Sequence, residues 1–195
     1  MYCINISTHK ELPTAAEAVI EITKKWLQDM VVGLNLCPFS HTVFAQDQIH
    51  YAVSPGVGDA HWKTFYVRQL RLLFDSEETD IATSLLMFPE GLENFDDYLD
   101  VLDWFEELLE QGDLTQHVQL ASFHPRYRFD EVAADDLSHL TNRAPYPSIH
   151  LIRHAQMTKV LEHVEDPEQI YLENIASLEK LGRSRVEAMC PWGKK

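Results

Sequence analysis

The chain has 195 residues, of which 45% are apolar and 24% charged, and these values exclude a disordered chain and favour one globular domain. Its 31 acidic and 16 basic residues give a formal net charge of −15, which repels phosphate groups and anionic lipids, so we expect neither nucleic acid nor a membrane as partner. The sequence has no apolar run long enough to cross a membrane and no signal-peptide pattern, and its cysteines are few and odd in number. We therefore expect a cytoplasmic protein in a reducing compartment.

The first predicted element is a helix that begins after Thr14. Thr14 and Glu17 have the spacing of a capping box, in which each side chain accepts a hydrogen bond from the backbone of the other residue. Gly33 offers a C-terminal stop. Between them, apolar residues recur at helical intervals: Val19, Ile22, Trp26 and Met30. A short β-branched run at 49–53 then predicts a strand, and the Pro- and Gly-containing residues 54–58 predict a turn.

Two helices and two strands are predicted in the middle of the chain. Asp59 is placed to cap a helix, and residues 81–88 are apolar on both faces, as in a strand covered on both sides. Asn94 predicts the start of a further helix, and residues 118–123 the next strand. The two helices would bury the stripes Trp62, Phe65, Gln69, Leu70 and Leu73, and Phe95, Leu99, Leu102, Phe105 and Leu109.

The last part of the chain predicts one strand and one helix. Residues 149–152 follow a long irregular segment and have the composition of a strand. Asp166 and Pro167 then provide a cap and a first-turn proline for a helix that stops at Gly182.

This order of elements predicts the α/β fold class, with a mostly parallel or mixed sheet of about four strands flanked by helices. The main alternative is a ferredoxin-like α+β sandwich with an antiparallel sheet. We expect one domain over residues 1–195, with short flexible ends near 1–12 and 184–195. In a parallel sheet the loops that follow the strands meet at one rim, where ligands bind, and here that rim would collect four loops, at residues 55–58, 89–91, 124–127 and 153–154.

The residues from 122 to 154 are the least generic part of the chain. Pro125 ends a strand and restricts the preceding His124 to an extended conformation. The long connection up to Ser148 favours either function or hidden structure, and a helical turn is predicted at 135–140. Prolines on both sides of Tyr146 would present this side chain at little entropic cost.

Three motifs carry a resemblance to a known family. They are Asn35-Leu36-Cys37-Pro38-Phe39, then Phe123-His124-Pro125 with Tyr127, and Asn142-Arg143-Ala144-Pro145-Tyr146-Pro147 leading into His150-Leu151-Ile152-Arg153. Together they resemble the bacterial domain of unknown function 1415 family, from about Trp26 to about Gly182. The resemblance implies no reaction, cofactor or catalytic residue.

The first functional hypothesis is an enzyme that acts on a small anionic or carbonyl-bearing metabolite. His124 would serve as general acid or base, because histidine titrates near neutral pH, and Arg143 and Arg153 would bind an anion through paired hydrogen bonds. Tyr146 is a further catalytic candidate, and the other candidate substrate contacts are Asn142, Tyr127 and His150. The structural alternative is that the arginines pair with acidic residues and His124 only caps a strand end.

Cys37 adds a nucleophilic variant of this hypothesis, since a thiolate beside His124 would be activated. Cys37 closely follows the first helix, whose negative end would raise the pKa of the thiol. A buried, unreactive cysteine is the favoured alternative, because free cysteine is among the most buried residue types.

Two other classes of function stay open. A zinc or iron site would draw on Cys37, His41, His124, His150 and His154, but these do not form a tight ligand motif, so no residue is assigned as a metal ligand. A non-catalytic binding or assembly surface would use aromatic and arginine side chains, namely Phe123, Tyr127, Phe129, Tyr146, Arg126 and Arg128. The cofactor and the oligomeric state are not predicted.

Overall fold

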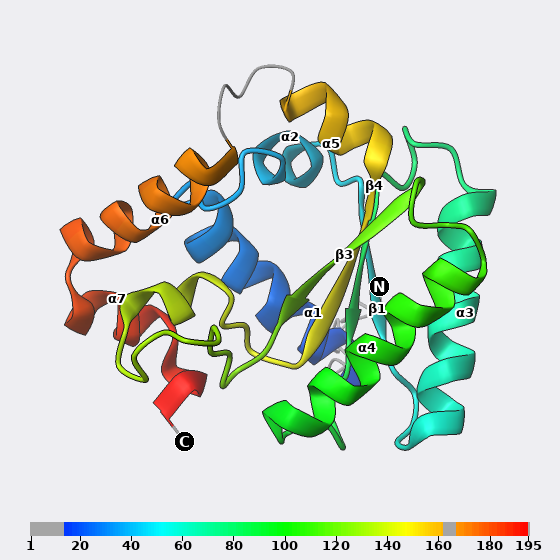
Figure 1. Ribbon diagram of the computed structural model, residues 1–195, viewed down its shortest axis with the longest axis horizontal. Helices are drawn as coiled ribbons and strands as arrows, with labels where there is room; N and C mark the ends of the chain where they lie inside the picture. The colour runs from blue at the N-terminus through cyan, green and yellow to red at the C-terminus, as the bar shows by residue number, and fades with distance from the viewer. Residues whose placement is uncertain (1–13, 162–166, 195) are drawn as a thin grey trace, which may run out of the picture.

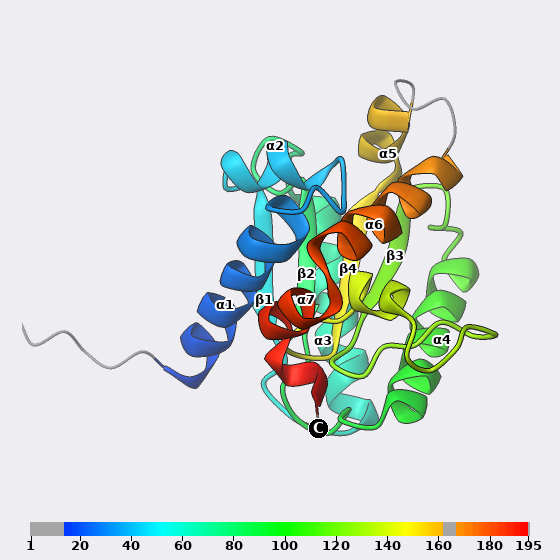
Figure 2. The ribbon, with the colours of Figure 1, turned by 90° about the vertical axis from the view of Figure 1, so that its left-hand side faces the viewer.

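The computed structural model describes residues 14–161 and 167–194, which form a four-stranded sheet with helices on both of its faces (Figure 1). Figure 2 shows the strands side by side in the order β1-β2-β4-β3. β1 runs parallel to β2, whereas β4 is antiparallel to both of its neighbours. The strands are β1 Ile49–Val53, β2 Thr83–Met87, β3 Val118–Phe123 and β4 Ser148–Arg153. The predicted α/β class with a mixed sheet is confirmed, and the parallel β1–β2 pair rules out the purely antiparallel alternative.

The helices that carry strong sequence signals form as predicted. These are α1 Ala15–Trp26, α3 Asp59–Asp75, α4 Phe95–Gln111 and α6 Pro167–Leu181. The capping box is present, since Glu17 N–H donates to Thr14 Oγ1 at 3.2 Å and Thr14 N–H donates to the Glu17 carboxylate at 2.6 Å. The cap of α3 is Gly58 instead of the predicted Asp59, because glycine adopts the positive φ of 97° found there. Asp166, the predicted cap of α6, lies outside the described residues.

The remaining helical elements of the described chain are short. They are α2 Ser40–Ala45, α5 His154–Leu161, α7 Arg183–Met189, the 3-10 turns η2 Leu137–Thr141 and η3 Pro191–Lys194, and the π-helix η1 Leu27–Val32. The predicted turn at 135–140 corresponds to η2. The predicted first helix does continue to Gly33, but after Trp26 it widens into η1, where Gly33 N–H donates to the carbonyl of Gln28 at 3.0 Å.

The strand directions bring three loops to one edge of the sheet and place the fourth at the other edge. Val53 pairs with Met87, and Ser148 pairs with both Met87 and Phe123. The loops after β1, β2 and β3 therefore meet at this edge, together with the segment that precedes β4. Arg153 pairs with Val118 at the opposite edge, so the predicted rim is wrong for residues 153–154.

Each face of the sheet is covered by its own set of helices. On one face, α3 and α4 enclose a core that includes Tyr66, Phe88 and Phe105, none of which is exposed. On the other face, a second core joins α1 and η1 to the C-terminal helices through Met30, Leu178 and other residues. β2 is buried along its whole length because helices cover it on both sides.

The C-terminal residues differ from the sequence-based expectation. Residues 184–194, predicted as a flexible end, form most of α7 and all of η3, and Val186 and Cys190 are buried in the second core. The predicted flexible end at 1–12 lies outside the described residues. No helix in the described part of the chain has the length and apolarity needed to cross a membrane.

Candidate functional site

An enclosed cavity of about 60 Å³ lies against the sheet, on the face covered by η1 and α2. Its wall is mostly apolar and includes Trp26, Val43, Leu85 and Phe123. The polar side chains in the wall come from separate elements and are Cys37, Ser40, Thr83, His150 and Gln156. No lysine, arginine, aspartate or glutamate is among the described residues that line it. The cavity is therefore an uncharged space that holds a thiol and an imidazole.

The π-helix η1 forms one wall of this cavity. Leu27 and Val31, both buried, face the cavity from η1, and Trp26 does so from the end of α1. Single turns of π-helix are rare and are often found at functional sites, because the wider turn redirects side chains relative to an α-helix.

His150 is held in one tautomer by Thr83. The Thr83 hydroxyl donates to the carbonyl of Leu151 at 2.6 Å, so its oxygen accepts a hydrogen bond from His150 Nε2–H at 2.5 Å. Nδ1 of the neutral imidazole then carries the lone pair. Part of the His150 residue stays exposed, but protein encloses its imidazole, and this desolvation lowers the pKa of His150 to about 4. At neutral pH the ring is an uncharged proton acceptor.

Cys37 is a half-buried free thiol between η1 and α2. Burial raises the pKa of the Cys37 thiol, and the backbone N–H groups of Phe39 and Ser40 act in the opposite direction. The predicted direction of the shift is right, but desolvation is its largest cause, where we had expected the negative end of the first helix. At neutral pH Cys37 and His150 therefore line one cavity as a neutral thiol and a neutral imidazole.

His124, the predicted acid or base, is completely buried and does not line this cavity. Its Nε2–H donates to the carbonyl of Leu92 at 2.9 Å, and its Nδ1 accepts from the backbone N–H of Arg126 at 3.0 Å. The rings of Phe95 and Tyr98 each lie 5.1 Å from the imidazole. Desolvation lowers the pKa of His124. Both ring nitrogens hold backbone groups, so the arrangement gives His124 a structural role.

Three other predicted site residues make hydrogen bonds at the rim after β3, two of them to backbone carbonyls. The Asn142 side chain donates to the carbonyl of Ser122 at 3.1 Å, and Arg143 Nε donates to the carbonyl of Tyr127 at 3.3 Å. The Tyr127 hydroxyl lies 3.4 Å from Ser122 Oγ. These contacts join the segment before β4 to the end of β3. The polar side chains of this segment therefore hold it in place against the sheet.

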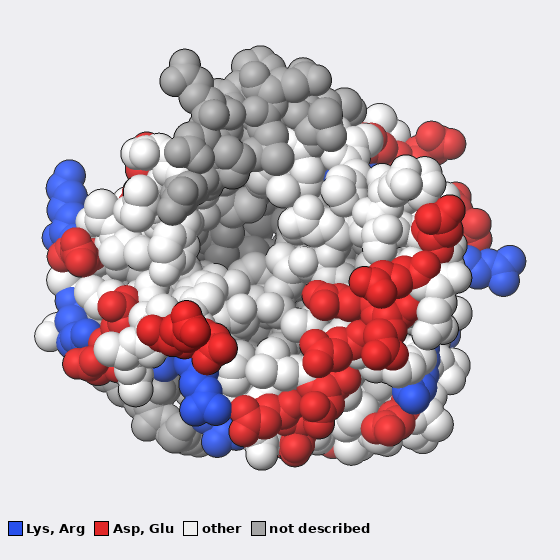
Figure 3. Space-filling view, in the orientation of Figure 1, with Lys and Arg blue, Asp and Glu red and all other residues white. Residues whose placement is uncertain are grey.

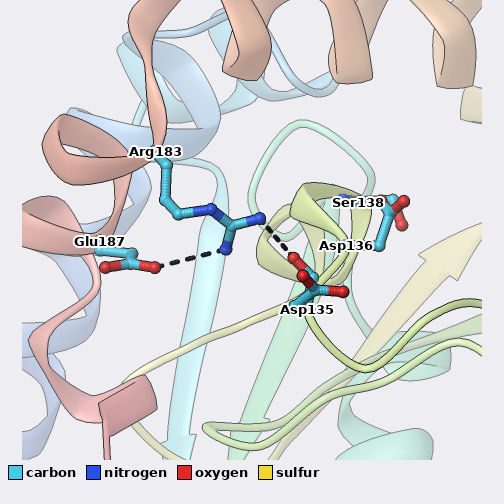
Figure 4. Close-up of polar contacts among 5 residues, drawn as sticks. All are labelled: Asp135, Asp136, Ser138, Arg183 and Glu187. Atoms are coloured by element: carbon cyan, nitrogen blue, oxygen red, sulfur yellow. Dashed lines mark hydrogen bonds and ion pairs between the residues drawn. The ribbon is translucent and has the colours of Figure 1, made fainter.

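The C-terminal helix α7 also contacts the segment before β4 (Figure 4). Arg183 donates one hydrogen bond to the carbonyl of Asp135 and lies 3.4 Å from the carboxylate of Glu187. The neighbouring Asp136 caps η2 by accepting from Ser138 N–H at 2.8 Å. This hydrogen bond is the largest cause of the lowered pKa of Asp136. The segment before β4 is thus held both by the end of β3 and by α7.

Arg153 is not an anion clamp beside His124. It lies at the opposite edge of the sheet, where its guanidinium donates to the carbonyls of Leu73, Ser76 and Ile81. Two of these carbonyls belong to the C-terminal end of α3 and the residue after it, so Arg153 provides the positive charge and the donors that a helix C-terminus favours.

The aromatic residues of the predicted binding surface do not all share the same surroundings. The ring of Phe123 packs against Trp26 in the second core, with centroids 5.3 Å apart, and Phe129 packs against Tyr127 and His139. Tyr146 lines a separate hollow with Ala15 and Pro55 at the carboxyl end of β1. Arg126 and Arg128 are exposed. Phe123 and Tyr146 therefore have other surroundings than Tyr127 and Phe129, which contact each other.

Three of the five residues considered for a metal site lie apart from the other two, Cys37 and His150. His41 is exposed on α2, His124 is buried at one edge of the sheet, and His154 follows β4 at the other. Within residues 14–161 and 167–194, no group of three or more histidine, cysteine, aspartate or glutamate side chains is placed to hold a metal ion.

The surface charge is concentrated away from the cavity. In Figure 3, acidic side chains follow the exposed side of α4, and the middle of the same face carries no described charged residue. The exposed acids of this helix are Asp96, Asp97, Asp100, Asp103, Glu106, Glu107 and Glu110. This negative field, like the overall charge of −15, disfavours an anionic ligand.

The sequence names two of the polar cavity residues, Cys37 and His150, but groups them only in the metal-site hypothesis and not as a nucleophile and its base. Thr83, which orients His150, is not singled out, although a threonine within a strand that is apolar on both faces is a usable signal. Ser40 and Gln156 come from α2 and α5, the short helices that the sequence does not predict. Cys37 and His150 share a wall only because β4 runs antiparallel to β2.

Three comparisons with known proteins complete the description. A family model described as "Protein of unknown function (DUF1415)" matches residues 18–188, which is most of the chain. No curated protein and no solved structure matches the chain.

Proposed function

Because the chain belongs to the DUF1415 family, whose description names no activity, we propose a function from its geometry: an enzyme in which Cys37 adds to a small, uncharged, carbonyl-bearing compound inside the enclosed cavity. His150 receives the thiol proton. The observation that carries the proposal is a thiol and an imidazole of fixed tautomer in one uncharged wall. A nucleophile, a base and a third group that orients the base are the usual parts of a covalent site.

The residues that line the cavity favour an uncharged carbonyl compound over an anion as the ligand. Neither Arg143 nor Arg153 lines the cavity, so nothing in its described wall would neutralise a carboxylate or a phosphate. The raised pKa of Cys37 and the lowered pKa of His150 both favour neutral groups in an apolar space. An uncharged ligand can enter such a space without the cost of removing a charge from water.

The reaction step is an addition of S–H across C=O. The thiol proton moves to Nδ1 of His150, and the sulfur electron pair forms a bond to the carbonyl carbon. The C=O π electrons move to the oxygen, which then takes the proton from His150. Atoms and electrons balance without an oxidant or reductant, and Thr83 keeps the imidazole oriented throughout.

The test compares iodoacetamide, which is uncharged, with iodoacetate, which is anionic, and reads each cysteine by peptide mass spectrometry. Both rates are normalised to those of glutathione. We expect Cys37 of the folded protein to prefer iodoacetamide at least tenfold, because the cavity is uncharged and the protein is acidic. Cys190, which is buried outside the cavity, is the internal control and stays unmodified.

A matched pair of variants tests the role of His150. Thr83→Val removes the hydroxyl that accepts from Nε2, whereas Thr83→Ser keeps it. We expect the rate at Cys37 to fall about tenfold in the valine variant, on the scale of general-base effects, and to persist in the serine variant. Protection of Cys37 in the folded wild-type protein, or equal reaction with the two reagents, would overturn the proposal.

A further inference from the structure

The cavity that holds Cys37 and His150 is too small for a complete ligand. Its volume of about 60 Å³ is enough for a few water-sized groups. Binding sites for whole metabolites are usually several times larger, on the order of 300 Å³ or more. If a ligand reacts here, only its reactive end fits inside, and the rest has to lie in a neighbouring space.

Such a space adjoins the cavity. A groove of about 510 Å³ lies between α2, the start of α5 and the loop before β2. Phe39, Val43 and Gln156 belong to the walls of both the groove and the cavity. The groove and the cavity therefore adjoin at these three side chains.

The groove differs from the cavity in its chemistry. Its polar groups are mainly amides and hydroxyls, supplied by Gln46, Gln48, Thr42 and Thr79. Glu78 is the single charged residue among those described in its wall. Gln48 Nε2 donates to the carbonyl of Thr79 at 2.9 Å, and Gln156 Nε2 donates to Glu78 at 3.2 Å. Uncharged groups that both donate and accept hydrogen bonds suit amide or hydroxyl groups of a ligand and, beside Glu78, do not suit an anion.

We propose that this groove binds the uncharged polar tail of the same ligand whose carbonyl end enters the cavity. The ligand class is an elongated, uncharged molecule with an apolar carbonyl head and an amide- or hydroxyl-bearing tail. Gln156 lies where the two parts meet, and its side-chain amide donates a hydrogen bond to Glu78 at 3.2 Å. This inference rests on the proposed function.

Three alkylating probes test the inference on the full chain. The first is iodoacetamide, the second an N-substituted iodoacetamide with a tail of two amide groups, and the third the same molecule with a terminal carboxylate. We expect the amide tail to raise the rate at Cys37 at least tenfold over iodoacetamide, after normalisation to glutathione. The terminal carboxylate should remove most of this gain because it meets Glu78 and the acidic field.

Two glutamine variants test whether the rate increase that the amide tail brings at Cys37 depends on the groove. Gln46 lines the groove but not the cavity, so Gln46→Ala should abolish the gain from the tail, measured as the ratio of the tailed-probe rate to the iodoacetamide rate of the same variant. Gln116→Ala, an exposed position before β3, is the matched control and should change neither rate. If iodoacetamide labels Cys37 but the tail brings no gain, the inference fails and the proposed function stands. If neither probe labels Cys37, the proposed function fails as well.

Discussion

Thr83 and His150 lie diagonally across β2 and β4, and the threonine hydroxyl holds the imidazole in a single tautomer. The Thr83 hydroxyl has one proton, which it donates to the carbonyl of Leu151. In the hydrogen bond between Thr83 and His150 the imidazole is therefore the donor. Burial of the imidazole lowers the pKa of His150 to about 4. A histidine that resists protonation makes the stability of the fold depend on pH.

The first prediction concerns this pH dependence. The pKa of His150 is 6.5 in the unfolded chain and about 4 in the folded protein, so the unfolded state binds more protons between these values. The contribution of His150 to stability is therefore complete above pH 6.5 and is lost as the pH falls towards 4, by about 2 to 3 kcal/mol. Urea unfolding at pH 7 and pH 4.5 measures the loss.

His150→Gln provides the control for this prediction, because glutamine cannot be protonated. Every carboxylate and every other histidine titrates in both proteins, and His124, whose pKa is also lowered, cancels in the comparison. The gap in unfolding free energy between wild type and variant should shrink by about 2 to 3 kcal/mol between the two pH values. A gap independent of pH would contradict a desolvated imidazole at position 150.

The second prediction separates His124 from the site. His124→Gln should lower the free energy of unfolding by about 3 kcal/mol, because it disturbs two buried hydrogen bonds and the ring contacts with Phe95 and Tyr98. Chemical denaturation at pH 7 gives this value, and His41→Gln, at an exposed position, should leave it unchanged. Unchanged stability of the His124 variant would indicate that the residue is free for chemistry after all.

The third prediction concerns Arg153 as a cap of α3. Arg153→Lys keeps the charge but cannot donate in three fixed directions, so we expect a loss of about 2 kcal/mol. For a chain of this size that loss lowers the melting temperature by roughly 4 to 8 °C. The matched control is Arg71→Lys, whose exposed ion pair with Asp75 spans 3.4 Å and adds little. Equal melting temperatures for the two variants would argue against the cap.

The fourth prediction concerns the junction of β3 and β4. The buried Tyr98 hydroxyl donates to the carbonyl of Ser148 at 2.8 Å and accepts from Phe123 N–H at 3.2 Å. Tyr98→Phe leaves both backbone groups without this partner, at a cost of about 2 kcal/mol. Hydrogen exchange at Phe123 should accelerate accordingly, whereas Tyr171→Phe, at an exposed position, should have no effect there. An unchanged exchange rate at Phe123 would show that the hydroxyl does not support the sheet.

Most of the fold follows from local patterns in the sequence. The capping box at Thr14 reflects interactions within a few residues, the apolar stripes of α3 and α4 reflect the burial of one helix face, and the composition of β2 reflects a strand that is buried along its whole length. The short helices α2 and α5 give no comparable pattern because they span only one or two turns. The π-helix continues an α-helical pattern and cannot be distinguished from it by periodicity.

The candidate site, in contrast, depends on contacts between residues that are far apart in the sequence. The sequence by itself determined an acidic α/β domain, the unusual segment from 122 to 154, and Cys37 and His150 as residues with chemical potential. Only the tertiary structure decided that His124 and Arg153 satisfy backbone groups, and that Cys37 and His150 share a cavity. The physical reason is the direction of β4. An antiparallel β4 sends Arg153 to the far edge of the sheet and turns His150 towards Thr83, and strand direction is set by long-range pairing that no local pattern encodes.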